Sequence, residues 1–196
     1  MTSSGEFERC IASGGVAVFP SDTVYGLACD PDDGSAVKRL YELKGRSPSK
    51  PSAVMFFDLQ PALDALADLG PRTREALERL LPGPVTVLLE NAAGRWPLAC
   101  GEDPATVGLR VAAVPELEHV GLAVLQSSAN RSGGPDASRL LEVPEEIREG
   151  ADLVLDGGEL PGTPSAVVDL RQYEREGAWS LVRAGAVGAD TLAQSL

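Results

Sequence analysis

Hydrophobic and polar positions alternate along the chain in blocks that predict strands and helices in turn. Apolar runs typical of buried strands lie at Val16–Pro20, Ala53–Phe57 and Val85–Leu89. Between the first two runs, the apolar residues of Ser35–Leu43 recur at helical spacing, which predicts an amphipathic helix that begins near Asp33. The first half of the chain therefore has the pattern of an α/β protein.

The second half of the chain continues the alternation with shorter connections. Helices are predicted over Pro61–Leu69 and Thr73–Leu81, within Leu140–Arg148, and near the C-terminus. Further strands are predicted at Thr106–Val111, Leu122–Gln126, Leu153–Leu155, Ala166–Leu170 and Trp179–Val182. Several late strands are separated by loops too short for a helical crossover, so the sheet should be mixed. We predict an α/β (α+β) fold with a twisted mixed sheet flanked by helices.

Composition and charge limit the class of protein. A chain of 196 residues with 43% hydrophobic content can bury one substantial core, so one domain over residues 1–196 is predicted. The formal net charge of -12 repels nucleic-acid backbones, and tRNA binding should be weak or absent. Three cysteines without a C-x-x-C pair fit a reducing compartment, and no apolar run reaches membrane-spanning length. We therefore expect a cytoplasmic protein without a membrane partner.

Several common catalytic and phosphate-binding motifs are missing from the sequence. His119 is the only histidine, which disfavours a Ser-His-Asp nucleophile and a multi-histidine metal centre. Neither G-x-x-x-x-G-K-[ST] nor G-x-G-x-x-G occurs, so P-loop and Rossmann phosphate binding are unavailable. Any nucleotide must be bound in another way.

The lysines are confined to one short stretch of this acidic chain. Lys38, Lys44 and Lys50 are its only lysines, and Arg39 and Arg46 lie among them. A solvated helix face followed by a basic loop would give this pattern. The other interpretation is an anion site, because a guanidinium fork and an ammonium both bind phosphate oxygens. On that interpretation the K-x-R pair and Lys50 grip a triphosphate.

Three polar segments are further candidates for ligand contacts, and each also has a plain structural explanation. Ser127–Asn130 follows a predicted strand and precedes glycines, so it can form a ligand loop or a capped turn. Pro20–Leu27 can orient a small polar substrate or form a turn. Leu160–Ser165 can be a flexible loop near a site or an ordinary connection.

Together these segments resemble the YrdC-like threonylcarbamoyl-AMP synthases. The resemblance covers about residues 12 to 186 and rests on seven motifs in the family's order and spacing. The motifs are P-S-D-T-V-Y-G-L at 20–27, K-G-R at 44–46, L-P-G-P-V-T at 81–86, V-G-L-R at 107–110, S-A-N-R-S-G at 128–133, S-A-V-V-D at 165–169 and L-V-R-A-G at 181–185.

The resemblance implies a fold and a reaction. The fold is a single YrdC-like domain whose sheet encloses a positively charged cavity. The reaction joins L-threonine, bicarbonate or CO2, and ATP, with Mg2+ carried by the ATP, into threonylcarbamoyl-AMP and pyrophosphate. In that family this nucleotidyl transfer supplies the t6A modification at adenosine 37 of tRNA, so downstream tRNA-modifying proteins are expected partners.

The resemblance also implies roles for individual residues. The catalytic candidates are Lys44 and Arg46, and no side chain is expected to act as a covalent nucleophile or to hold a resident metal. The residues implied for ATP binding are Lys44, Arg46, Lys50, Ser128, Asn130 and Arg183. Those implied for L-threonine binding are Thr23, Arg110 and Ser165.

Some positions depart from the family's pattern. The changes are at Ser47, Pro51-Ser52, Met55, Val111–Val114 and Ala166, and we expect them near the amino-acid side of the cavity. They leave two alternatives open: a related carbamoyl-adenylate enzyme with another acceptor, and a non-catalytic RNA-binding or ribosome-assembly module. ATP handling is the better supported half of the hypothesis.

Overall fold

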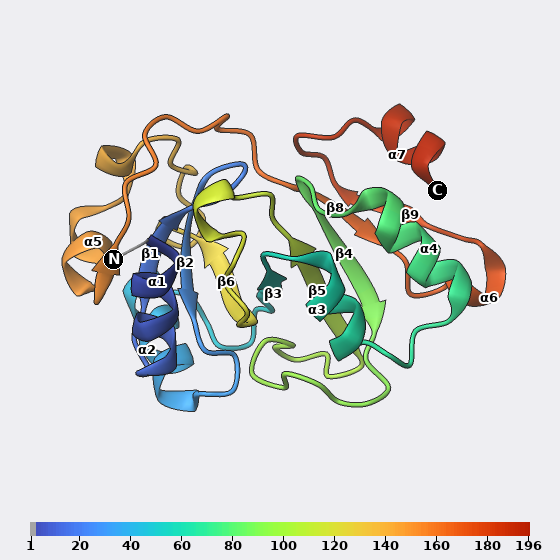
Figure 1. Ribbon diagram of the computed structural model, residues 1–196, viewed down its shortest axis with the longest axis horizontal. Helices are drawn as coiled ribbons and strands as arrows, with labels where there is room; N and C mark the ends of the chain where they lie inside the picture. Colours follow the sequence, from blue (N-terminus) through green and yellow to red (C-terminus); the bar gives the residue numbers. More distant parts are fainter. Residues whose placement is uncertain (1–2) are drawn as a thin grey trace.

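One mixed sheet of nine strands forms the frame of the computed structural model, which describes residues 3–196 (Figure 1). The predicted domain begins at Met1, but Met1 and Thr2 lie outside the described residues. The strand order is β7-β1-β2-β6-β3-β5-β4-β8-β9. The strands are β1 (Ala17–Pro20), β2 (Tyr25–Cys29), β3 (Ala53–Phe56), β4 (Val85–Glu90), β5 (Thr106–Val111), β6 (Val124–Ser128), β7 (Leu153–Val154), β8 (Ala166–Asp169) and β9 (Ser180–Arg183).

The sheet is mixed, as predicted. β7 with β1, β3 with β5, and β4 with β8 pair in parallel, and the other neighbours pair antiparallel. The helices are α1 (Ser3–Ala12), α2 (Gly34–Lys44), α3 (Leu59–Ala65), α4 (Pro71–Leu80), α5 (Glu145–Gly150), α6 (Tyr173–Glu176) and α7 (Ala189–Ser195), with 3-10 turns η1 (Pro115–Leu117) and η2 (Leu140–Glu142). The prediction of an α/β fold with helices flanking a mixed sheet is confirmed. No described helix is long and apolar enough to cross a membrane.

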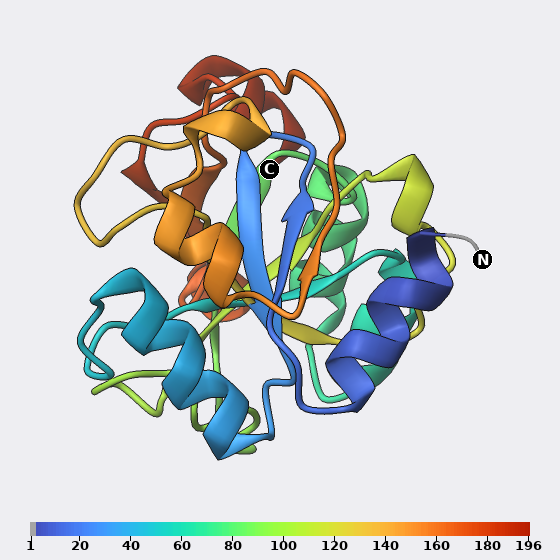
Figure 2. The same cartoon turned by 90° about the vertical axis from the view of Figure 1, so that its left-hand side faces the viewer.

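Both faces of the sheet are covered near β1, which explains why that strand is continuously apolar. Val16 and Val18 belong to the larger core cluster, which also contains side chains of α2 and α5. Ala17 and Phe19 face the smaller cluster, which contains Phe7 of α1. Figure 2 shows α1 on one side of β1 and β2, and α2 and α5 on the other. A strand covered on both faces loses the apolar-polar alternation of a half-exposed strand.

Farther along the sheet, the face that α1 covers at β1 is left partly open. On β5, Leu109 and Val111 lie in the larger core cluster. Because successive side chains of a strand point to opposite faces, Arg110 must project from the other face. Thr86 of β4 and Gln126 of β6 also lie outside both apolar clusters. These polar side chains from central strands all line one cavity on that face.

Helix α2 begins and ends as its sequence predicts. The side chain of Asp33 caps it by accepting hydrogen bonds from the backbone N–H groups of Ser35 at 2.8 Å and Ala36 at 3.1 Å. At the other end, Gly45 takes a left-handed conformation with φ 57°. A glycine adopts this conformation without the cost of a Cβ clash, so the chain turns sharply before Arg46.

The predicted elements differ from the structure in a few places. The predicted helix within Leu140–Arg148 is divided into η2 and α5, because Pro144 disfavours a helical conformation in the residue before it. Helix α1, strand β2 and helix α6 were not predicted. In α1 only Phe7 and Ile11 are buried, so its apolar stripe is too narrow to be conspicuous in sequence.

We predict that Phe7→Ala lowers the free energy of unfolding by about 3–5 kcal/mol, because it opens a cavity in the smaller core. Phe7 is fully buried, and its ring makes edge contacts with Phe19 at 5.4 Å and Phe57 at 5.5 Å between centroids. Chemical denaturation measures the change. Leu141→Ala is the control, since Leu141 is 83% exposed and should change stability by less than about 0.5 kcal/mol. Equal small effects would contradict the docking of α1.

Candidate active site

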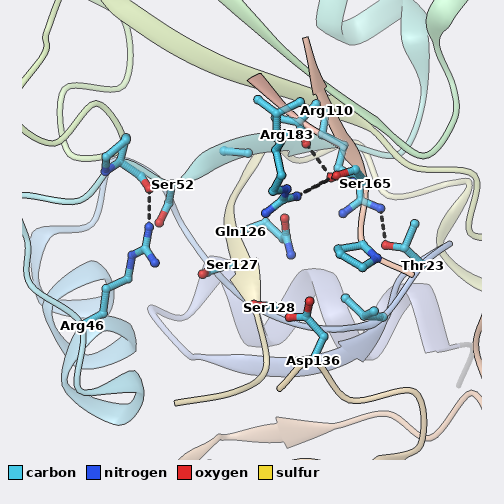
Figure 3. A pocket seen from close by; sticks show the side chains of 16 residues that line it. Thr23, Arg46, Ser52, Arg110, Gln126, Ser127, Ser128, Asp136, Ser165 and Arg183 are labelled. Carbon is cyan, nitrogen blue, oxygen red and sulfur yellow. Dashed lines mark hydrogen bonds between the residues drawn. The ribbon is translucent and has the colours of Figure 1, made fainter. Parts of the chain in front are cut away.

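A cavity of about 190 Å³ opens on the uncovered part of the sheet (Figure 3). Three arginines line it from distant parts of the chain: Arg46 after α2, Arg110 on β5 and Arg183 on β9. Within residues 3–196, Asp136 is the only acidic side chain in its wall. Guanidinium groups bind carboxylates and phosphates through paired hydrogen bonds, so the cavity is suited to an anionic ligand.

Arg110 is the most deeply buried of the three arginines, at 3% exposure. Its Nη2 donates to Thr23 Oγ1 at 2.7 Å and forms an ion pair with the Asp22 carboxylate. Burial lowers the pKa of Arg110, the Asp22 charge opposes that change, and Arg183 adds to it. Arg110 Nε and Asp22 Oδ2 are buried without a hydrogen-bond partner among the described residues. A ligand that accepts from Nε would remove the cost of that unsatisfied donor.

The polar segment Ser21–Val24 is the turn between β1 and β2, and it also forms a wall of the cavity. Ser21 Oγ lies 2.7 Å from the Val24 carbonyl, to which it donates, and 3.0 Å from Thr23 Oγ1. These contacts hold Thr23, which is fully buried, toward Arg110 (Figure 3). The segment is therefore a turn, as one interpretation has it, and part of the cavity wall; that it orients a substrate stays a prediction.

Ser165 and Arg183 form a neighbouring part of the wall. Arg183 Nη2 donates to the Ser165 carbonyl at 2.7 Å, and Ser165 Oγ lies 2.9 Å from Thr86 Oγ1. Gly185 allows this arrangement, because a Cβ at its position would lie 2.3 Å from the Ala166 nitrogen. The glycine of the L-V-R-A-G motif is thus required by close backbone approach rather than by chemistry.

The segment Asp156–Ser165 crosses from β7 to β8 along one edge of the molecule (Figure 1). The Tyr25 hydroxyl anchors its first residues, lying 2.9 Å from Asp156 Oδ1 and accepting from Gly157 N at 2.9 Å. Farther along, Gly162 N donates to the Thr23 carbonyl at 2.9 Å. This segment is therefore fixed to the β1–β2 hairpin at two points.

Lys44 lies behind the cavity rather than in its wall. The side chain is 2% exposed, and Nζ donates to the Asn130 carbonyl at 2.9 Å, to Asn130 Oδ1 at 3.0 Å and to the Ser128 carbonyl. Burial lowers its pKa to about 8, the Arg46 charge contributes to this, and the Asp136 charge opposes it. Its three bonds hold the turn at 128–130 in place, so its donors are directed to the protein and not into the cavity.

Asn130 organises the same turn from within. It is 7% exposed, its Oδ1 accepts from Ser128 Oγ at 2.8 Å, and its Nδ2 donates to the Gly134 carbonyl at 2.7 Å. A second contact joins Nδ2 to Asp136 Oδ1 at 3.3 Å. Ser128 and Asp136 therefore line the cavity, while Asn130 does not.

The structure brings six of the nine predicted site residues together. Those that line the cavity are Thr23, Arg46, Arg110, Ser128, Ser165 and Arg183. Lys44 and Asn130 support it, and Lys50 is exposed outside its wall. Sequence reasoning missed Gln126 and Asp136; the signals available were a polar residue ending an apolar strand and an acid following a glycine-rich loop.

Most of the positions that depart from the family's pattern lie away from the cavity. Met55 is fully buried in the smaller core, and Ala166 is fully buried in the larger one. Val111–Val114 follows β5 and contributes no side chain to the cavity wall. Pro51 and Ser52 are the exceptions, because both line the cavity, and Ser52 Oγ lies 2.9 Å from the Tyr41 hydroxyl. The differences therefore alter the cavity wall less than their number suggests.

Comparison with known proteins gives consistent matches over nearly the whole chain. The Sua5/YciO/YrdC family, described as "Telomere recombination", matches residues 9–185. A protein of Nitrosococcus oceani named threonylcarbamoyl-AMP synthase is 37% identical over 173 residues, which cover 85% of this chain and 92% of that protein.

Solved structures show the same fold. Pyrococcus abyssi Sua5 complexed with L-threonine aligns with a TM-score of 0.85 at 29% identity, covering 97% of this chain and 56% of that one. The chain thus spans a little over half of that longer protein. Escherichia coli YciO aligns with a TM-score of 0.80 over 95% of this chain and 91% of its own, but at 22% identity it bears on the fold alone.

We predict that raising the pH from about 8 to 10.5 increases the free energy of unfolding of the wild-type protein relative to that of Lys44→Met. The pKa of Lys44 is about 8 in the native state and 10.5 ordinarily. Between these values the unfolded chain still holds the Lys44 proton and the native state has lost it, so stability rises with pH. The rise should be at most about 3 kcal/mol. Urea denaturation of both proteins measures it, and their shared thiols cancel in the difference. If the difference in unfolding free energy between the two proteins does not change with pH, the lowered pKa of the buried Lys44 ammonium is contradicted.

Proposed function

The chain belongs to the Sua5/YciO/YrdC family, and from this membership we propose that it is a threonylcarbamoyl-AMP synthase. In the proposed reaction, L-threonine and bicarbonate or CO2 give a carbamate, and a carbamate oxygen attacks the α-phosphorus of ATP. The P–O bond to the β-phosphate breaks, and pyrophosphate leaves. One observation carries the proposal: a single cavity combines a buried guanidinium beside a threonine hydroxyl with two further guanidiniums.

The amino-acid end of the cavity is assigned to Thr23, Arg110 and Ser165. Arg110 Nε has no protein partner, so it can donate to the substrate carboxylate while Nη2 stays bound to Asp22 and Thr23. The Ser165 hydroxyl is held by Thr86 at 2.9 Å and closes the same end. This arrangement fixes the substrate amine relative to the rest of the cavity, which is the main contribution such a site makes to rate.

The nucleotide end is assigned to Arg46, Ser128 and Arg183, which line the cavity. Arg46 Nη2 donates to the Pro51 carbonyl at 2.7 Å, whereas its buried Nε has no described partner and can bind a phosphate oxygen. Positive groups directed at the departing pyrophosphate stabilise the charge that develops there, without any covalent nucleophile from the protein. Arg46 is therefore the leading catalytic candidate.

The other predicted ATP-binding residues receive more indirect roles. Lys44 and Asn130 position Ser128 through the turn at 128–130. Lys50 is exposed just beyond the cavity wall, where it is the proposed contact for the outermost phosphate. Proteins that use the adenylate to modify tRNA are the proposed partners. The net charge of -12 supports weak or no direct binding of tRNA by this chain.

Purified protein should release pyrophosphate from ATP when L-threonine and bicarbonate are both present. A coupled phosphate assay over a panel of amino acids measures this. If an amino acid other than threonine supports pyrophosphate release and threonine does not, the acceptor has changed. Ser52 in the cavity wall is then the first residue to examine. Equal release with every amino acid, or with none, would contradict the assignment of threonine.

Arg46→Ala should weaken ATP binding about 10- to 100-fold, because one or two charge-assisted hydrogen bonds are lost. Arg110→Ala should leave ATP binding within about threefold and should raise the KM for L-threonine by a similar 10- to 100-fold. Isothermal titration with ATP and steady-state kinetics separate the two effects.

Removing Arg110 also leaves Asp22 buried and unpaired, which can destabilise the fold. Arg110→Lys is therefore the matched variant: it keeps the charge but loses the paired geometry, and it should still raise the KM for threonine. Equal losses of ATP affinity in the Arg46 and Arg110 variants would disprove this division of the cavity.

A further inference from the structure

One carboxylate faces the arginine-lined cavity. Asp136 lies on the loop that follows β6, and Figure 3 shows its side chain beside Ser128, on the opposite side of the cavity from Arg183. Its Oδ1 accepts one long hydrogen bond, 3.3 Å, from Asn130 Nδ2. Within residues 3–196, no hydrogen bond or ion pair is formed by Oδ2. That oxygen is therefore free to bind a ligand.

The charge of Asp136 conflicts with the ligand that its surroundings favour. Arg46 and Arg110 each have a buried Nε without a partner in the described chain, which points to an anion in this cavity. A carboxylate in the same wall repels a triphosphate, and partial burial strengthens the repulsion because water screens it less. The conflict is resolved when a cation lies between the two.

We propose that Asp136 binds the divalent cation that accompanies ATP. The inference rests on the proposed function, because the nucleotide supplies the other ligands. Mg2+ prefers hard oxygen ligands and in nucleotide sites is commonly held by one or two carboxylates together with phosphates and water. Asp136 Oδ2 fits this requirement. Ser128, which lines the same wall, donates its hydroxyl proton to Asn130, so the lone pairs of its Oγ remain to bind a cation.

The rest of the chain supports a cation that arrives with the nucleotide. Residues 3–196 contain no group of three or more His, Cys, Asp or Glu side chains that could hold a metal ion by themselves. Asp136 alone is too small a ligand set for a stable protein–metal complex. Together with the phosphates it is sufficient, so cation and nucleotide should bind as a unit.

The test is ATP binding with and without Mg2+, measured by isothermal titration on the full chain. Wild-type protein should bind Mg–ATP more tightly than metal-free ATP. Asp136→Asn should bind Mg–ATP about tenfold more weakly than wild type, yet bind metal-free ATP as tightly or more tightly, because the repulsion is gone. The matched control is Asp190→Asn, which removes an exposed charge on α7 outside the cavity and should change neither value.

A second measurement uses Mn2+ in place of Mg2+ and follows its electron paramagnetic resonance. When wild-type protein is added, the concentration of free Mn2+ should fall only if ATP is present. With Asp136→Asn, the affinity that this fall reports should be about tenfold lower. An equal loss of affinity with and without Mg2+ would make Asp136 a structural residue and overturn the proposal.

Two further outcomes also decide the question. A raised KM for the amino acid, with unchanged Mg2+ dependence of ATP binding, would assign Asp136 to the substrate ammonium and overturn the metal role. Failure of wild-type protein to bind ATP under any condition would refute the proposed function itself, and this inference with it. If wild-type protein binds ATP and Asp136→Asn leaves the Mg2+ dependence of that binding unchanged, this inference is refuted and the proposed function stands.

Discussion

A buried guanidinium in the middle of the sheet determines the rest of the candidate site. Strand alternation on β5 puts Leu109 and Val111 into the larger core, so Arg110 has to emerge on the opposite face. A buried charge needs a partner of opposite sign, and Asp22 supplies it from the β1–β2 turn. In the sheet, β6 and β3 lie between β2 and β5, so this ion pair connects two separated parts of the molecule across the cavity.

The K-x-R motif shows how local geometry assigns different roles to two neighbouring cations. Lys44 is the last residue of α2 and packs inward, where its ammonium donates to the turn at 128–130. The left-handed Gly45 then reverses the chain and brings Arg46 to the cavity. One cation therefore shapes the loop that the other cation faces. The turn at Gly45 allows the two neighbouring cations to point to these different places.

Much of the fold could be predicted from the sequence, because most of its strands are short apolar runs, and β1 is apolar throughout where both faces of the sheet are covered. Helix α1 could not, since two buried residues, Phe7 and Ile11, leave too weak a pattern. The motifs identified most of the cavity wall, but charge alone could not separate Lys44, which is buried, from Arg46, which is in the wall. Burial depends on tertiary packing, and a residue count in one segment contains no information about it.

The parallel pairing of β8 with β4 has a consequence for how the protein is made. Val85–Leu88 must wait for its partner Ala166–Asp169, which is synthesised much later. Ser165 enters the cavity wall only through this pairing, and Arg183 only through the pairing of β9 with β8. A nascent chain emerging from the ribosome therefore has the β1–β2 turn and Arg46 long before it has a closed cavity. Only a chain whose synthesis has passed β9 can bring all three arginines of the cavity together.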